Sequence, residues 1–287
     1  CRAGVELLPD GTIILTYFTN ATTDAPGATY MLMSTDNGQS WGNGSNDIGA
    51  EVSSEILDLG IGKRGSIAVI DSENFLMPVY GRASGSNSYN VEATATGAGP
   101  FSTYHRDAVM LHYQKTDGEW NVVWETLIDR EIDETALMYT GSGVVSGTGA
   151  ATTFDGDLYA FAREIGNVYK STDCGRSWAR IATEEPRTWT TSGTIMSANQ
   201  IIQPRFTKVS DECWFVTYAN YNSLNYSYDR LCRPVYGKMF YPEAGWYATT
   251  SRLIYDEVGH GSTDMADPCS VLTADGKLLA IYYNTST

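Results

Sequence analysis

The sequence of 287 residues has little cysteine, little histidine, little positive charge and no long apolar run. Its five cysteines show no C-x-x-C spacing and its three histidines no H-E-x-x-H pattern, so no metal and no other cofactor is expected. No apolar run approaches the roughly 18 residues of a membrane helix, so no membrane span is expected. The formal net charge of −15 argues against nucleic acid as a partner, because phosphate binding requires a basic face.

The residues that are plentiful favour a β protein. The chain has 28 glycines, 19 tyrosines and 7 tryptophans, while charged residues make up only 18% of it. This composition suits many short strands joined by glycine-rich turns. A chain of this length can form one large β domain, and no linker divides it. We therefore expect a single domain over residues 1–287.

Two segments have nearly the same sequence. Residues 34–41 and 171–178 both read S-T-D-x-G-x-S-W, and each follows a strand-like run. At this spacing the aspartate can accept backbone N–H bonds inside a hairpin turn, the glycine can supply a positive φ, and the tryptophan can pack against the sheet. Two copies in a fixed register indicate a repeat architecture.

A second repeat consists of a strand, an Asp-Gly turn and another strand. It is clear at residues 5–17, 151–161 and 270–282, and degenerate copies surround two further turns. The five turn aspartates are Asp10, Asp71, Asp155, Asp211 and Asp275. Hairpins at residues 109–120 and 234–246 stand where further S-T-D-x-G-x-S-W turns would be expected. Strand pairs at this spacing predict an all-β propeller with five visible blades.

The register of these strand pairs also predicts a polar centre. Counting back eight residues from the turn aspartates of the three clear copies reaches Arg2, Gly147 and Asp267. In the degenerate copies, Arg64 and Arg205 lie within a residue or two of the same level. These side chains would make a cation-rich pocket around the propeller axis. The alternative is that charged surface residues fall at this level by chance.

The S-T-D-x-G-x-S-W segments resemble the Asp box of sialidases and related β-propellers, which usually have six blades. The 84-residue gap between the second and third turn aspartates is the place where a sixth blade could lie. The resemblance implies that three arginines hold a substrate carboxylate, since guanidinium groups bind carboxylates bidentately. Arg2, Arg163 and Arg233 match the family positions, and Arg205 and Arg230 compete for the third of them.

The same resemblance implies an acid/base aspartate about a dozen residues before the first Asp-box aspartate. Asp24 precedes Asp36 by 12 residues and is the candidate. The alternative is an ordinary turn aspartate, which the neighbouring Pro26 and Gly27 would also explain.

Two positions depart from the sialidase pattern. No glutamate stands near Gly147, where the family glutamate is expected, and Asp267 stands where the family has its tyrosine nucleophile. An aspartate there suits a two-carboxylate hydrolase acting on a neutral sugar, with Asp24 as the acid and Asp267 as the base or nucleophile.

The expected function is that of a sialidase-like glycoside hydrolase that removes a terminal acidic sugar from a glycan. The alternatives are a non-catalytic carbohydrate-binding propeller, a neutral-sugar exoglycosidase and a polysaccharide lyase. The expected partner is a glycan, and the expected location is outside the cell or on its surface.

Overall fold

The computed structural model describes residues 2–19, 28–42, 49–62, 65–83, 107–130, 132, 134–163, 167–182, 188–191, 194–197, 199–222, 235–243, 252–255 and 266–283. Within these ranges the chain is nearly all β, with one short 3-10 helix, η2 (Gly149–Ala151). No helix in this part of the chain is long and apolar enough to cross a membrane.

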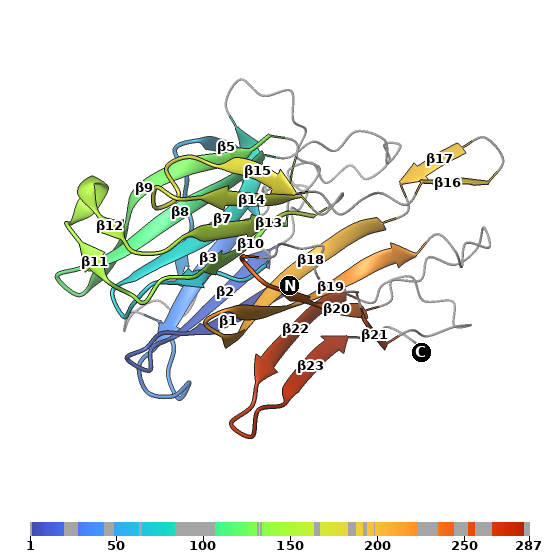
Figure 1. Cartoon of the computed structure of the whole chain (residues 1–287). Helices are drawn as coiled ribbons and strands as arrows, with labels where there is room; N and C mark the ends of the chain where they lie inside the picture. Colours follow the sequence, from blue (N-terminus) through green and yellow to red (C-terminus); the bar gives the residue numbers. More distant parts are fainter. Residues whose placement is uncertain are drawn as a thin grey trace. The chain divides into compact units, whose positions relative to one another are not determined.

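Four sheets of four or five strands make up most of the described structure (Figure 1). Sheet 1 has the order β1 (Arg2–Leu7), β2 (Ile13–Thr19), β3 (Ala28–Ser34) and β4 (Ala50–Glu51). Sheet 2 has the order β5 (Leu57–Gly62), β7 (Asn74–Ala83), β8 (Asp107–Thr116) and β9 (Glu119–Asp129), and β6 (Ala68–Val69) also pairs with β7. Sheet 3 has the order β10 (Ala136–Tyr139), β13 (Leu158–Phe161), β14 (Val168–Ser171) and β15 (Ala179–Ala182). Sheet 4 has the order β18 (Asn199–Ser210), β19 (Cys213–Asn222), β20 (Val235–Phe240) and β21 (Arg252–Tyr255).

Three smaller sheets have two strands each. One ribbon pairs β11 (Val145–Ser146) with β12 (Thr153–Phe154), and another pairs β16 (Thr188–Thr191) with β17 (Thr194–Ser197). Sheet 5 pairs β22 (Ala266–Leu272) with β23 (Leu278–Tyr283).

The sheets confirm the predicted β-propeller fold. In sheets 1 to 4 the strands that follow one another in the sheet also follow one another along the chain, as in the blades of a propeller. The five turn aspartates fall in sheets 1 to 5 in order. Because sheet 5 has only two strands, the described residues hold four complete blades and the inner pair of a fifth. They hold no sixth blade, and residues 84–106, in the gap where it was expected, lie outside them.

By its internal contacts the chain forms two compact units. The first contains residues 1–160 and 170–179, and the second contains residues 161–169 and 180–287. The single domain expected over residues 1–287 stays a prediction.

The two S-T-D-x-G-x-S-W segments form the same hairpin turn between the third and fourth strands of sheets 1 and 3. In sheet 1, the Asp36 carboxylate accepts bonds from the Ser40 N–H at 2.8 Å and the Ser40 hydroxyl at 2.6 Å. Asp173 accepts the equivalent bonds from Ser177 at 2.9 and 2.6 Å. Gly38 and Gly175 have φ values of +81° and +87°. These contacts confirm the turn roles predicted for the aspartate and the glycine.

The apolar core of the first unit lies between sheets 1 and 2. Alternate residues of β2 point inward, since Ile14, Thr16 and Phe18 are buried and the residues between them are half-buried. From sheet 2, Phe75 is fully buried and stacks on Tyr113 with ring centroids 4.9 Å apart. This period of two is what the alternating sequence of the strand predicts.

Sheet 2 also carries a buried polar network. The Asn74 side-chain oxygen lies 3.1 Å from His112 Nε2 and accepts a bond from Gln114 Nε2 at 3.1 Å. Gln114 in turn accepts a bond from the N–H of Gly149 at 2.8 Å, which ties β8 to helix η2. The other ring nitrogen of His112, Nδ1, is buried without a hydrogen-bond partner among the described residues. A proton there would have no acceptor, so the folded protein keeps His112 neutral.

In the second unit, aromatic rings gather around Phe206 of β18. Its ring makes edge contacts with Phe161, Trp214 and Phe240, at centroid distances of 6.1, 6.5 and 6.2 Å. Phe240 is buried and Phe206 half-buried, so this cluster supplies apolar contacts for sheet 4.

Sheet 5 is attached to sheet 4 by one of its faces. The Thr207 hydroxyl of β18 donates to the Ser270 carbonyl at 2.7 Å. On the opposite face, Val271 lies directly across from Leu279, and these side chains are 49% and 50% exposed. Among the described residues, this apolar face has no cover.

The protonation of His112 predicts a loss of stability in mild acid. Burial, with a smaller contribution from the Arg176 charge, lowers the pKa of His112 from 6.5 to about 4, and the nearby Asp71 offsets part of this shift. Between these two pH values only the unfolded chain binds the proton. The free energy of unfolding should therefore fall by about 3 kcal/mol as the pH drops from 6.5 to 4.

Urea unfolding between pH 7.5 and 4.0 measures this effect, with His112→Gln as the comparison variant. The variant should lose most of the slope above pH 4. Aspartates such as Asp36, whose pKa is lowered to about 2 by hydrogen bonds from Ser40, begin to lose their contribution below about pH 5, and the variant shares this loss. An equal slope in both proteins would refute the assignment to His112.

Candidate functional site

The innermost strands of sheets 2 and 4 are both irregular near the positions that the sequence analysis selected by counting back from the turn aspartates. In sheet 2 the inner strand is split into β5 and β6, and the pairing of β5 with β7 shifts register twice. In sheet 4 the pairing of β18 with β19 shifts between Ile202 and Arg205, and Gln203 has a φ of +53° although it is only 1% exposed. Bulges and buried left-handed residues are concentrated near functional sites, where they redirect side chains.

The inner strands of sheets 5 and 3 show the same behaviour. The pairing of β22 with β23 shifts between Ala266 and Cys269, which brackets Asp267. Just before β10 of sheet 3, Glu134 has a φ of +27° and is fully buried. An inner strand that departs from regular geometry at this level is therefore a common feature of four sheets.

Glu134 occupies the register position that the sequence analysis assigned to Gly147. Arg2, Glu134 and Asp267 each stand five residues before the last residue of their inner strand, which is Leu7, Tyr139 or Leu272. The assignment of Gly147 was wrong, because the strand before the third Asp-Gly turn is not the inner strand of sheet 3. That place belongs to β10, and Gly147 lies in the ribbon that intervenes between β10 and β13. A glutamate is therefore present at the level where sequence counting found none.

The extra ribbon is fastened by the turn aspartate itself. The Asp155 carboxylate accepts bonds from the Tyr139 hydroxyl at 2.5 Å, from the Ser142 N–H and hydroxyl at 2.8 Å, and from the Val144 N–H at 3.0 Å. The bond from Tyr139 contributes most to holding the pKa of Asp155 well below its usual range. Asp155 thus stabilises a long connection, where the sequence predicted a short hairpin turn.

A close approach between two inner strands fixes the backbone beside Glu134. Ser66 accepts a bond from the Leu137 N–H at 3.0 Å, and its hydroxyl donates to the Leu137 carbonyl at 3.3 Å. Gly65 has a φ of +88°, and a Cβ at that position would lie 2.3 Å from the Thr135 carbonyl oxygen. Only glycine allows this contact, so Gly65 positions Thr135 and, through it, Glu134.

The structure describes some of the candidate residues from the sequence analysis fully, some only in their backbone, and some not at all. Asp24, Arg64 and Arg233 lie outside the described residues. Arg2 and Asp267 lie in β1 and β22, where the structure describes the backbone. Two of the arginines have described side chains, and both are half-buried with a buried Nε atom. They are Arg163, which follows β13, and Arg205, which lies opposite Thr217 in sheet 4. Their roles at a substrate site stay predictions.

Glu134 was missed because its strand is short and its hairpin is interrupted. The apolar run Ala136–Tyr139 is buried throughout and directly follows Glu134 and Thr135. A search for buried strands independent of Asp-Gly turns would have found this run, and with it the glutamate at its head.

Comparison with solved structures supports the fold. No protein-family model matches the chain, and no curated protein does. A Dyadobacter fermentans protein of unknown function has a TM-score of 0.58 and 16% identity, over 99% of this chain and 72% of that one. The Penicillium chrysogenum α-L-arabinanase has a TM-score of 0.55 and 15% identity, over 96% and 73%. A Trypanosoma rangeli sialidase has a TM-score of only 0.42 and 15% identity, over 99% and 52%, too low to carry an argument. The first two likenesses show the fold, whereas the more specific expectation of a sialidase is not confirmed.

The contact at Gly65 predicts a large cost for adding one methyl group. Gly65→Ala should reduce the free energy of unfolding by roughly 3 kcal/mol, since the left-handed conformation and the clash with the Thr135 carbonyl both contribute. Gly11→Ala is the matched control, because Gly11 has the same φ of +88° and nothing within 4 Å of the added Cβ. The control should lose only about 1 kcal/mol. Equal losses in urea unfolding would contradict the proposed close packing.

Proposed function

We propose that the chain is a glycoside hydrolase acting on a neutral sugar, with L-arabinofuranosides as the substrate class. The observation that carries the proposal is Glu134, a fully buried carboxylate held in a left-handed backbone at the head of an inner propeller strand. A non-glycine residue in this conformation costs about 1 to 3 kcal/mol, and such strain is found mainly at functional sites. Buried carboxyl groups are also the groups whose proton affinity a protein can adjust for acid/base chemistry.

Hydrolysis of a glycoside requires two carboxyl groups. One donates its proton to the glycosidic oxygen as the bond to the anomeric carbon breaks. The other either attacks that carbon or takes a proton from the water that does, and the water hydroxyl ends on the sugar. Glu134 is one member of the pair in this proposal. Asp24 and Asp267, the two carboxylates that the sequence analysis selected, are the candidates for the other.

The choice of a neutral sugar has two supports. Asp267 stands at the place where the sialidase pattern has its tyrosine, and a carboxylate there would repel an anionic substrate. The Penicillium enzyme, which has a TM-score of 0.55, is an α-L-arabinanase. The likeness in fold favours an arabinose substrate, whereas the carboxyl groups supply the chemistry.

A sialoside is the second candidate substrate. It is favoured by the two half-buried arginines, Arg163 and Arg205, because an arginine held in place is suited to bind a carboxylate. In this reading Arg163 binds the acidic sugar together with Arg2 and Arg233, as the family resemblance implies.

Replacing Glu134 tests the proposed chemistry. Glu134→Gln should lower kcat for p-nitrophenyl α-L-arabinofuranoside or linear arabinan by a factor of about 10² to 10⁴, because the side chain keeps its shape and loses its acid/base function. The matched control is Glu73→Gln, at an exposed turn glutamate, which should keep full activity. Circular dichroism establishes that both variants are folded.

The pattern of activity separates the readings. Cleavage of the arabinosides that depends on Glu134 supports the proposal, and cleavage of a fluorogenic sialoside alone would replace it with the second candidate. Full activity of Glu134→Gln would refute the assigned role. Binding of glycans without any cleavage would make the chain a carbohydrate-binding propeller.

A further inference from the structure

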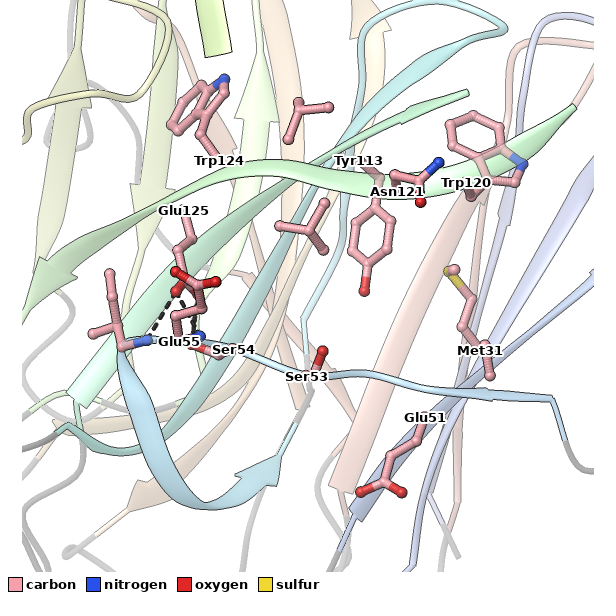
Figure 2. Close-up of a pocket in the computed structure, with 14 residues that line it drawn as sticks. Met31, Glu51, Ser53, Ser54, Glu55, Tyr113, Trp120, Asn121, Trp124 and Glu125 are labelled. Atoms are coloured by element: carbon pink, nitrogen blue, oxygen red, sulfur yellow. Dashed lines mark hydrogen bonds between the residues drawn. The ribbon is translucent and has the colours of Figure 1, made fainter. Parts of the chain in front are cut away.

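A hollow lies between sheets 1 and 2, apart from the inner strands. It has a volume of about 850 Å³, within the range of roughly 300 to 1,000 Å³ usual for small-molecule sites. One wall is formed by Met31 of β3 and the segment 50–56, and the other by Tyr113 of β8 and residues 120–125 of β9 (Figure 2). All of these residues belong to the first unit.

Tyr113 brings a polar group into the hollow. Its side chain is only 5% exposed, and its ring is fixed by stacking on Phe75. Its hydroxyl points into the hollow toward the 53–55 segment (Figure 2). Burial, and then the nearby Glu125 charge, raise the pKa of Tyr113, so the hydroxyl stays protonated and can donate. A ligand oxygen in the hollow could therefore accept a hydrogen bond from this hydroxyl.

One wall of the hollow is rigid because Glu125 fixes it. Its carboxylate accepts bonds from the Ser54 hydroxyl at 2.6 Å, the Glu55 N–H at 2.6 Å and the Ile56 N–H at 2.8 Å. These bonds join the segment after β4 to the outer strand of sheet 2. A wall held in this way loses little conformational entropy when a ligand binds.

The charges of the lining select against anions. Three glutamates line the hollow, Glu51, Glu55 and Glu125, and its lining contains no lysine, arginine or histidine. A phosphate, a sulfate or an acidic sugar would therefore meet like charge without a compensating cation. The ligand must be neutral or positively charged.

The aromatic side chains do not form a cage for a cation. The Tyr113 ring stacks on Phe75, and the Trp120 ring packs on Phe75 at 4.8 Å with Lys115 Nζ at 5.9 Å. The Trp124 ring is occupied by Arg176, whose Cζ lies 4.9 Å from the ring centroid. A cation–π site needs aromatic ring faces that are open to the ligand, and these contacts leave no pair of them. What remains is a hydroxyl, an amide, seryl oxygens and carboxylates beside apolar edges, which is the set that binds sugar hydroxyl groups.

We propose that this hollow is a second, non-catalytic site that binds a neutral sugar unit of a polysaccharide. The Tyr113 hydroxyl donates to a sugar hydroxyl, and Asn121 and Ser53 bond to others at the rim. The edges of Trp120 and Met31 contact the apolar C–H groups of the sugar ring. The site goes beyond the proposed hydrolysis and does not require Glu134 to be catalytic.

Affinity electrophoresis with soluble polysaccharides tests the site. The protein carries Glu134→Gln throughout, and native gels contain linear arabinan, neutral galactan or polygalacturonate. Adding Tyr113→Phe removes one oxygen and keeps the ring stacked on Phe75. The dissociation constant for the neutral polysaccharide that retards the protein should rise about five- to tenfold, the worth of one hydrogen bond. Tyr30→Phe is the matched control, since Tyr30 stacks on Tyr17 and does not line the hollow, and it should leave the retardation unchanged.

Three results would overturn the proposal. They are unchanged retardation with Tyr113→Phe, equal retardation by polygalacturonate, and no retardation by any of the polysaccharides. None of them touches the proposed hydrolysis, which the kinetics of Glu134→Gln decide separately. Conversely, full activity of Glu134→Gln would refute the hydrolysis mechanism, and the effect of Tyr113→Phe on binding would then be read with a polysaccharide that the protein does not cleave.

Discussion

The close contact between the inner strands of sheets 2 and 3 is the constraint on which the candidate site depends. Gly65 packs against the Thr135 carbonyl because it has no side chain. Ser66 bonds to both the N–H and the carbonyl of Leu137. These contacts leave the backbone at Glu134 little freedom, so a residue in an unfavourable conformation can persist there. The buried carboxylate is therefore a consequence of how two blades meet, and β10 alone, with four residues, could not hold it.

Carboxylates that accept backbone N–H bonds recur throughout the first unit. Asp36, Asp155, Asp173 and Glu125 each hold a turn or a connecting segment in this way. The N–H donors satisfy these carboxylates, which need no cation as a partner. Part of the net charge of −15 thus reflects the way the turns are built.

The fold could be predicted from the sequence because its signals are local. The paired S-T-D-x-G-x-S-W turns and the Asp-Gly turns mark blades through bonds made within a few residues, and the structure contains these turns where they were expected. The site was harder to predict because its register depends on which strands pair. Counting from Asp155 assumed a short hairpin, whereas Tyr139 and Ser142 bind that aspartate across an inserted ribbon. The error moved the expected glutamate position from Glu134 to Gly147. The hollow beside Tyr113 had no sequence signal, since its walls come from segments some 60 residues apart.

Because Asp155 holds the ribbon, the connection between β10 and β13 can be long without moving β10 from its place in sheet 3. Residues 149–152 are anchored as well. The N–H of Gly149 donates to Gln114, and the Arg176 side chain donates to the carbonyls of Ala150 and Thr152. Gly147 and Thr148 form an exposed tip between these two attachments. Foreign sequence could be inserted at this tip, for example a peptide for display or labelling, while both attachments stay in place.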